Sequence, residues 1–210
     1  MIIGIDAEVL SYSKTGIGEY LYQIIKKLNL IDNENQYILY SNKQIYFDFK
    51  LNENWKIKLY NCKHLATWRF INLPKLLKKD GVDVLWGPRF YLPRKCRRIR
   101  YVATIHDLIT EKFPETRQSK KEIIMHKFFM KSVCKNAKEI IVDSENTKKD
   151  LVDVYKVNEN RVKVVYLGSN VAEKNKINNY KIEEIEKKFK INNRNRIYFF
   201  YNYNRAKKKY

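Results

Sequence analysis

Short apolar runs alternate with helix-forming segments along the first 166 residues, and this alternation restricts the fold more than any other feature of the sequence. Several runs are continuously apolar, which is typical of strands covered on both faces of a parallel sheet. The run at residues 55–60 alternates instead, which indicates a strand with one solvent-exposed face. We predict strands at residues 2–6, 37–40, 55–60, 82–86, 101–105, 139–142 and 162–165.

Amphipathic helices are predicted between these strands. In the segment 18–28, apolar residues recur with the spacing i, i+3, i+4, i+7, which places one apolar stripe along a helix. Strands that alternate with helices form a doubly wound parallel sheet, a Rossmann-like α/β fold, and we expect one such domain over residues 1–168. The other predicted helices are residues 68–78, with a kink at Pro74, residues 117–136, and a helix capped by Ser144 that ends near residue 154.

The sequence is strongly basic, with 43 Lys and Arg residues against 23 Asp and Glu residues and a formal net charge of +20. Such a field attracts polyanions, and nucleic acid, anionic lipid and nucleotide-linked substrates all qualify. The basic cluster at 94–100 and the basic helix at 117–135 are the candidate surfaces. The chain has no recognised nucleic-acid-binding signature and no basic strand interleaved with aromatic residues, so peripheral contact with an anionic membrane is favoured over nucleic acid.

Cysteine, histidine and hydropathy patterns exclude several classes of protein. Three widely spaced Cys residues without a CxxC pair, together with three His residues, give no zinc pattern, and we expect no metal. Unpaired cysteines fit a reducing compartment. The N-terminus lacks the basic region and long apolar run of a signal peptide, and no stretch of about 18 apolar residues occurs. We therefore expect a cytoplasmic protein, with any contact at the inner face of the membrane being peripheral.

The sequence changes character after Gly168. Residues 169–195 are rich in Asn, Lys and Glu, and we expect a linker with one helix near residues 182–189. Another apolar strand is predicted at residues 197–200, followed directly by a basic tail. A lone strand without a partner unit indicates that residues 196–210 hold the truncated first strand of a second domain.

Polar groups at the predicted strand ends are the candidate site, because open parallel sheets bind ligands beyond the carboxyl ends of their strands. Thr15, Gly16 and Gly18 lie between the first strand and the first helix. Glycine lets the backbone approach a ligand closely, and free amides at a helix N-terminus favour an anion. A tight turn between strand and helix explains the same residues without a ligand.

Three further strand ends carry polar or aromatic residues. His106 and Asp107 follow the strand at 101–105, where a histidine can contact a sugar hydroxyl or titrate near neutral pH, or can cap the strand end through backbone bonds. Ser144 and Thr147 follow the strand at 139–142, where a helix cap is the simpler explanation. Trp86 ends the strand at 82–86, and its ring suits a sugar face or, more often, the core.

Four segments, in order, resemble the retaining glycosyltransferases of family 4, which have the two-domain GT-B fold. The opening MIIGIDAEVLSYSKTGIGEYLYQII is similar to the family's IGIDAR-L…TGIGRY start, and DVLWGPRFYLP is similar to its D-hG-P-LP segment. VATIHDLITEKFPE resembles the family's TIHDL…FPE segment, and KEIIVDSENTKKDLVDVYKVNENRVKVVYLG resembles its adIIaVSe-tk-DL…v---kv-Vv-nG pattern. The similarity is continuous from residue 1 to about residue 168, and it implies the N-terminal half of a GT-B fold.

The resemblance implies roles for single residues. Gly16 and Gly18 match the glycine loop that lies near the donor phosphates and the acceptor. His106 matches the histidine that contacts the transferred sugar, and Asp107 matches its structural neighbour. On this basis the catalytic candidate is His106, and the substrate-binding candidates are Thr15, Gly16, Gly18, Asp107, Ser144 and Thr147.

The family also divides its work between two domains. Ser144 and Thr147 match the start of the helix that lines the cleft of the N-terminal domain, which mainly binds the acceptor. The C-terminal domain grips the nucleotide-sugar with an Arg and a Lys on the diphosphate and a downstream pair of Glu residues. Where the family continues with a G…PRKN segment, this chain has YNYNRAKKKY. The diphosphate role therefore does not transfer to Arg205 or the lysines after it, and we expect the donor half to be missing.

The resemblance implies retaining transfer of a hexose, such as mannose, from a nucleotide-sugar to a glycan or lipid-linked acceptor in cell-surface polysaccharide synthesis. It implies no cofactor beyond the nucleotide-sugar co-substrate. Without a donor half, we expect the isolated chain to be inactive or nearly so, because domain closure assembles the site. Two alternatives remain open: a basic module that binds anionic membrane or nucleic acid, and a gene remnant without activity.

Overall fold

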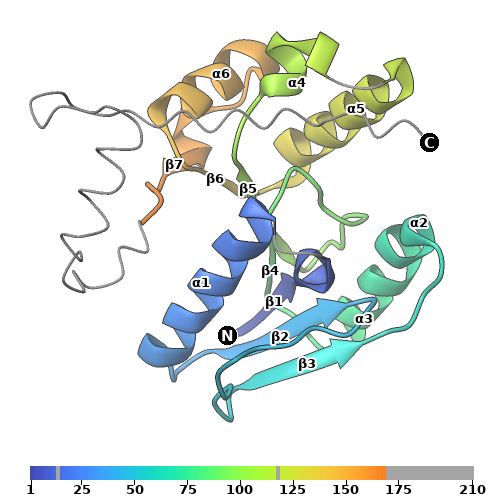
Figure 1. Cartoon of the computed structure of the whole chain (residues 1–210), viewed down its shortest axis with the longest axis vertical. Helices are drawn as coiled ribbons and strands as arrows, with labels where there is room; N and C mark the ends of the chain where they lie inside the picture. Colours follow the sequence, from blue (N-terminus) through green and yellow to red (C-terminus); the bar gives the residue numbers. More distant parts are fainter. Residues whose placement is uncertain (13–14, 117–118, 169–210) are drawn as a thin grey trace, which may run out of the picture. The chain divides into compact units, whose positions relative to one another are not determined.

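In the part of the chain that the structure describes, seven parallel strands form one sheet in the order β3-β2-β1-β4-β5-β6-β7 (Figure 1). All seven were predicted, with bounds that differ by at most two residues. The chain runs outward from β1 in one direction to β3 and then crosses to β4, so the strand order reverses between β1 and β4, where ligands bind in such sheets. The strands are β1 Ile2–Asp6, β2 Gln36–Ser41, β3 Trp55–Leu59, β4 Val84–Gly87, β5 Arg100–Ile105, β6 Glu139–Val142 and β7 Val162–Val164.

The computed structural model describes residues 1–12, 15–116 and 119–168. The chain divides into two compact units, Met1–Leu167 and Gly168–Tyr210. The helix predicted near 182–189 and the strand predicted at 197–200 lie outside the described residues. None of the helices within the described residues is long and apolar enough to cross a membrane.

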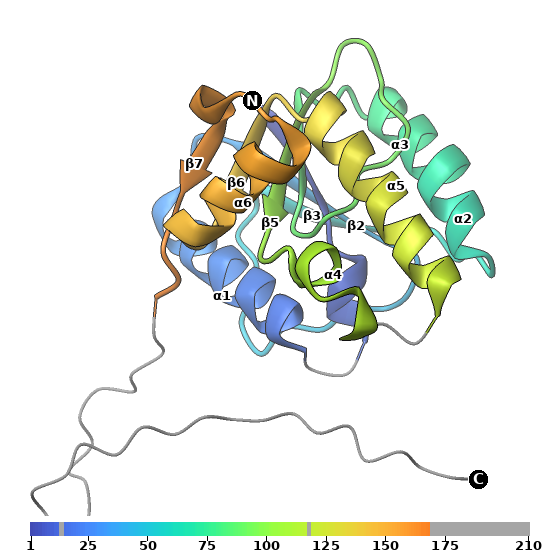
Figure 2. The ribbon, with the colours of Figure 1, turned by 90° about the horizontal axis from the view of Figure 1, so that it is seen from above.

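Helices cover both faces of the sheet, as a doubly wound fold requires. Figure 1 shows α1 on one side of β1 and β2, with α2 and α3 on the other, and Figure 2 shows α5 beside α2 and α3. The helical elements are η1 Glu8–Ser11, α1 Gly16–Ile31, α2 Leu65–Thr67, the π-helical turn η2 Trp68–Asn72, α3 Leu73–Lys79, α4 Ile109–Lys112, η3 Pro114–Thr116, α5 Lys120–Asn136, α6 Glu145–Tyr155 and η4 Glu159–Arg161.

The core has two parts, one on each face of the sheet. Consecutive strand residues point to opposite faces, so Leu39 packs toward α1 while Tyr40 packs toward α3. The α1 side buries residues such as Ile5, Leu21, Ile25 and Trp55, and the other side buries residues such as Leu73, Leu77, Leu85, Ala103, Met130 and Val133.

Three local features differ from the sequence predictions. The irregularity expected at Pro74 lies at η2, one turn earlier, and Pro74 occupies the first turn of α3, where its missing N–H costs no helical bond. The short helical elements η1, α4, η3 and η4 were not predicted. The helix predicted at 117–136 begins at Lys120 as α5, where Met130 is buried but the apolar residues Ile124 and Phe128 point into solvent.

Candidate functional site

His106 lies just beyond β5, and both of its ring nitrogens have partners. Nδ1 lies 3.2 Å from a carboxylate oxygen of Asp143, and Nε2 lies 3.1 Å from the backbone carbonyl of Pro88. Both partners accept hydrogen bonds, whereas a neutral imidazole has one N–H. A neutral ring therefore satisfies one contact at a time, and an imidazolium satisfies both. These two contacts hold the ring in place, and because the side chain is 18% exposed, a ligand can still reach it.

Aromatic and hydroxyl groups support the His106 ring from the side of α1. The Tyr20 ring meets it edge-on at 4.9 Å between centroids, and the Tyr20 hydroxyl lies 3.3 Å from Thr104 Oγ1. Trp86 donates its Nε1–H to the same Thr104 oxygen at 3.0 Å. Trp86 is thus a buried part of this support, as the core interpretation of that residue predicts.

The first turn of α1 is built by a side-chain cap. Thr15 Oγ1 accepts from the Gly18 backbone N–H at 3.1 Å. A Cβ at Gly18 would meet Thr15 Oγ1 at 3.3 Å, so packing favours glycine there, but a Cβ at Gly16 would meet nothing within 4 Å. Neither glycine has positive φ. The fold therefore gives a reason for Gly18 and none for Gly16.

Ser144 and Thr147 lie at the start of α6, and Thr147 also contacts the His106 backbone. Ser144 Oγ accepts from the Thr147 N–H at 3.1 Å, which confirms the predicted cap. The Thr147 hydroxyl donates to the His106 carbonyl at 3.1 Å. Asp107 is exposed, and its carboxylate accepts from the Ile109 N–H at 3.0 Å, at the start of α4. Of the predicted residues, Ser144 and Thr147 therefore join His106, while Asp107 turns away to shape α4.

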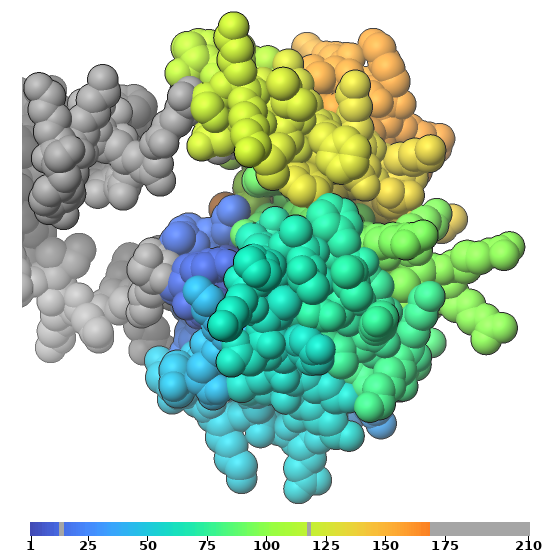
Figure 3. All heavy atoms as spheres, turned by 90° about the vertical axis from the view of Figure 1, so that its right-hand side faces the viewer, coloured from blue at the N-terminus to red at the C-terminus, as the bar shows by residue number. Residues whose placement is uncertain are grey.

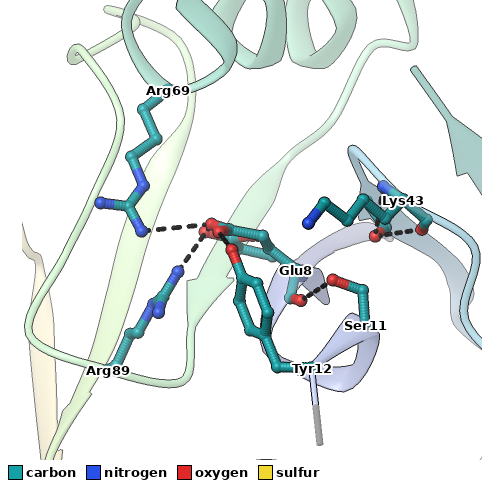
Figure 4. Close-up of polar contacts among 8 residues, drawn as sticks. Glu8, Ser11, Tyr12, Lys43, Arg69 and Arg89 are labelled. Atoms are coloured by element: carbon teal, nitrogen blue, oxygen red, sulfur yellow. Dashed lines mark hydrogen bonds and ion pairs between the residues drawn. The ribbon is translucent and has the colours of Figure 1, made fainter. Parts of the chain in front are cut away.

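A second polar cluster follows β1, centred on the fully buried carboxylate of Glu8 (Figure 4). Arg89 donates to Glu8 Oε2 at 2.6 Å, and Arg69 donates to the same oxygen at 3.2 Å. The hydroxyl of Tyr12 donates to the other carboxylate oxygen. Burial, and then this bond, raise the pKa of Tyr12 to about 12. Glu8 therefore joins side chains from η1, η2 and the segment after β4.

Asp6 lies beside this cluster as a second buried carboxyl group. Its Oδ1 accepts from the Glu8 N–H at 3.3 Å, and its Oδ2 has no hydrogen-bond partner among the described residues. Burial raises the pKa of Asp6, although Arg89 acts in the opposite direction. The Arg69 guanidinium stacks on the ring of Tyr91 at 4.2 Å, and the Tyr91 hydroxyl also lacks a partner within the described part of the chain.

The segment after β4 connects the two clusters. Pro88 supplies the carbonyl that contacts His106, and the next residue, Arg89, binds Glu8. A Cβ at Gly87 would lie 2.8 Å from the Tyr91 carbonyl oxygen, so this turn requires glycine. The Glu8 ion pairs therefore fix the backbone that orients His106. Among the described residues, no group of three His, Cys, Asp or Glu side chains is placed to hold a metal ion.

Comparison with known proteins identifies the family. The profile of Glycosyltransferase Family 4 matches residues 50–173, more than half of the sequence. The chain belongs to glycosyltransferase family 4. No curated protein matches it.

A search of solved structures finds proteins that are similar to this family 4 domain. The wall teichoic acid polymerase TagF is similar over 90% of the chain, with 11% identity and a TM-score of 0.50. The chain covers 44% of TagF, so it spans less than half of that protein. A glycosyltransferase from Rickettsia africae ESF-5 is 14% identical over 92% of the chain and 50% of its own, with a TM-score of 0.45. The fold is the Rossmann-like half of a GT-B architecture, as the resemblance implied.

Sequence reasoning about this family 4 domain missed several residues of the site. Sequence reasoning could have found Asp143, because this residue directly follows the strand at 139–142, just as Asp6 ends the strand at 2–6. Tyr20, Glu8, Arg69 and Arg89 carry no comparable local signal, because Arg69 and Arg89 reach Glu8 from 61 and 81 residues away and Tyr20 reaches His106 from 86 residues away.

Proposed function

We propose that this domain forms the acceptor side of a retaining glycosyltransferase. The reaction would move a hexose, such as mannose, from a nucleotide-sugar to a glycan or lipid-linked acceptor in cell-surface polysaccharide synthesis. The observation that carries the proposal is His106, which is held at the carboxyl edge of the sheet beside the start of α6 and against Tyr20 of α1. Family membership supports the reaction class.

The geometry suits contact with a sugar. His106 combines a ring fixed by two acceptors with partial exposure, so a hydroxyl group of a sugar can exchange for one of these contacts without moving the ring. The capped N-terminus of α1 presents backbone amides, which favour a negatively charged group. Gly16 leaves open space at that helix end. The Glu8 cluster contributes by positioning the Pro88 carbonyl.

In this family the second domain holds the nucleotide-sugar, so the proposal predicts different responses to acceptor and donor. We would titrate the 15N-labelled 210-residue chain with glycan fragments, with short-chain polyprenyl phosphate sugars and with nucleotide-sugars. Acceptor compounds are expected to shift the backbone amide signals of Gly16, Gly18, His106 and Thr147. Nucleotide-sugars are expected to leave them nearly unchanged, and the chain alone is expected to turn over far more slowly than about 1 per second.

A pair of histidine variants makes this test specific. His106→Ala is expected to weaken acceptor binding, whereas His64→Ala, at an exposed position whose side chain makes no cap bond, is expected to leave it unchanged. If no acceptor in the panel shifts these amides, the acceptor-side assignment is wrong. Turnover at an ordinary enzymatic rate by the chain alone would contradict the assignment of the donor site to another domain.

A further inference from the structure

One side of the domain displays apolar side chains among cations. We define this basic–apolar face as the outer stripe of α5, the exposed residues of η2 and α3, and the loop at residues 94–98. Figure 3 views this side, with α5 above α2 and α3 and the 94–98 loop projecting at the right. None of these elements belongs to the His106 or Glu8 clusters, apart from Arg69 in η2.

The outer stripe of α5 mixes cations with large apolar residues. Its members recur every three or four residues, so they lie on one side of the helix. Ile124 is 68% exposed and Phe128 is 63% exposed, whereas Met130 and Val133 on the opposite side are fully buried. The stripe consists of Lys121, Ile124, Phe128, Lys131 and Lys135.

The apolar residues of α5 continue onto η2. Phe70 is 41% exposed and Ile71 is 49% exposed. The ring of Phe70 stacks with Phe129 at 6.3 Å between centroids, and Phe129 meets Phe128 at 5.7 Å. The exposed apolar side chains of the two elements therefore belong to one patch.

A groove with a volume of about 920 Å³ adjoins this patch. Phe70, Ile71 and Pro74 contribute apolar wall, and Asp83 is the only carboxylate among the lining residues. Asp83 accepts a hydrogen bond from the Ile2 N–H at 2.8 Å. Within the described part of the chain, none of the lining cations forms an ion pair with a carboxylate. These cations are Lys75, Lys78, Arg94, Lys95, Arg97 and Arg98.

We infer that the basic–apolar face docks on the surface of an anionic lipid bilayer. Unpaired cations complement lipid phosphates, and each basic side chain near such a surface adds to the attraction. A merely solvated cationic face would not need four large apolar residues among its lysines, whereas an interfacial surface inserts such residues at the headgroup boundary. Long Lys and Arg side chains also reach past apolar contacts to place their charges at the headgroups.

Docking on this face would lay α5 along the bilayer, with the groove at the amino edge of the sheet and the start of α5 at the carboxyl edge. The chain leaves β5 at that edge and returns through α5 to the opposite edge, so α5 spans the sheet from one edge to the other. His106 lies on the same edge as the start of α5. Access of a lipid-linked acceptor to His106 follows from docking only if the proposed function holds, whereas docking itself does not depend on it.

The test is flotation of the full chain with vesicles of phosphatidylcholine containing phosphatidylglycerol, compared with vesicles of phosphatidylcholine alone. Wild-type protein is expected to float with the anionic vesicles only, and to be released by high salt. The triple variant Arg97→Glu, Arg98→Glu, Lys131→Glu is expected to bind about 100-fold more weakly, from the loss of three basic contacts. The pair Ile124→Ser, Phe128→Ser is expected to lose about tenfold from apolar contact.

Matched variants at other positions test whether vesicle binding depends on this face, on the overall charge of the protein or on residues outside the described range. Lys27→Glu, Lys50→Glu, Lys163→Glu removes the same charge from exposed positions outside the face, and Leu30→Ser, Ile31→Ser removes exposed apolar residues of α1. Both are expected to bind within about threefold of wild type, because screening limits the reach of a charge to about 8 Å.

Three results would overturn the inference. These are no flotation of wild-type protein with anionic vesicles, equal losses in the face variants and their matched controls, and tighter binding through the same residues to a duplex oligonucleotide than to the vesicles. The last result would assign the face to nucleic acid. None of these assays measures sugar transfer, so their outcome is separate from that of the proposed function.

Discussion

Replacing Glu8 with Gln removes the negative charge from between two guanidinium groups while nearly preserving side-chain volume. The Glu8 side chain is fully buried, and those of Arg69 and Arg89 are 15% and 18% exposed. Breaking a buried ion pair from one side costs about 3–5 kcal/mol. Because both arginines keep some contact with water, the lower end applies, and we expect the free energy of unfolding to fall by about 3 kcal/mol.

Urea denaturation followed by tryptophan fluorescence measures this change, since Trp68 is fully buried in the folded domain. A loss of this size is a large part of the roughly 5–15 kcal/mol that holds a typical domain together, so the midpoint shift is easy to resolve. Glu34→Gln, at an exposed position, is the matched control and is expected to change stability by less than about 0.5 kcal/mol. If Glu8→Gln behaved like this control, the ion pairs would not hold η1, η2 and the segment after β4 together.

Three other substitutions test the site and its supports. Gly87→Ala is expected to cost about 1–3 kcal/mol in urea denaturation, because its Cβ would press on the Tyr91 carbonyl; unchanged stability would mean that this turn has room to relax. Burial raises the pKa of Asp6, so Asp6 stabilises the fold fully below its ordinary pKa of 3.8, and this stabilisation is lost as pH rises through the pKa of the folded state. When the free energy of unfolding is measured over a pH series, Asp6→Asn should abolish that loss. Burial alone would raise the pKa of Glu111, but bonds from His126 and Tyr155 lower it overall. Glu111 therefore stabilises the fold above its ordinary pKa of 4.5, and this stabilisation is lost as pH falls. Glu111→Gln should make the free energy of unfolding depend less on pH on the acid side of the same series. A steep acid dependence in that variant would contradict the prediction.

Acid stability also depends on where such carboxylates lie in the fold. Glu111 of α4 contacts His126 of α5 and Tyr155 of α6, so its charge links three helices on one face of the sheet. Asp6 lies instead in the polar cluster after β1. Because the pKa of Asp6 is raised and that of Glu111 is lowered, the two groups change the free energy of unfolding in opposite directions as pH falls. The Asp6 and Glu111 variants separate these two effects.

The sequence alone predicted the elements that depend on local patterns. Continuous apolar runs identified most of the strands, because a strand in a doubly covered parallel sheet has no wet face, and alternation identified β3. The Ser144 cap was predictable because an N-cap bond joins residues three positions apart. His106 was recognised as a candidate because a residue that directly follows a strand lies at the ligand-binding edge whatever the rest of the sheet does.

Only the tertiary structure decided which side chains meet. Arg69 and Arg89 reach Glu8 from 61 and 81 residues away, and Tyr20 reaches His106 from 86 residues away. The sequence places four apolar residues, Ile124, Phe128, Met130 and Val133, in one helical segment, but only the packing of α5 decides that the last two are buried and the first two exposed. The spacing of apolar residues along the sequence indicates whether a segment is a helix or a strand. Contacts between segments that are distant in the sequence decide which face of that element is covered and which residue pairs with a buried charge.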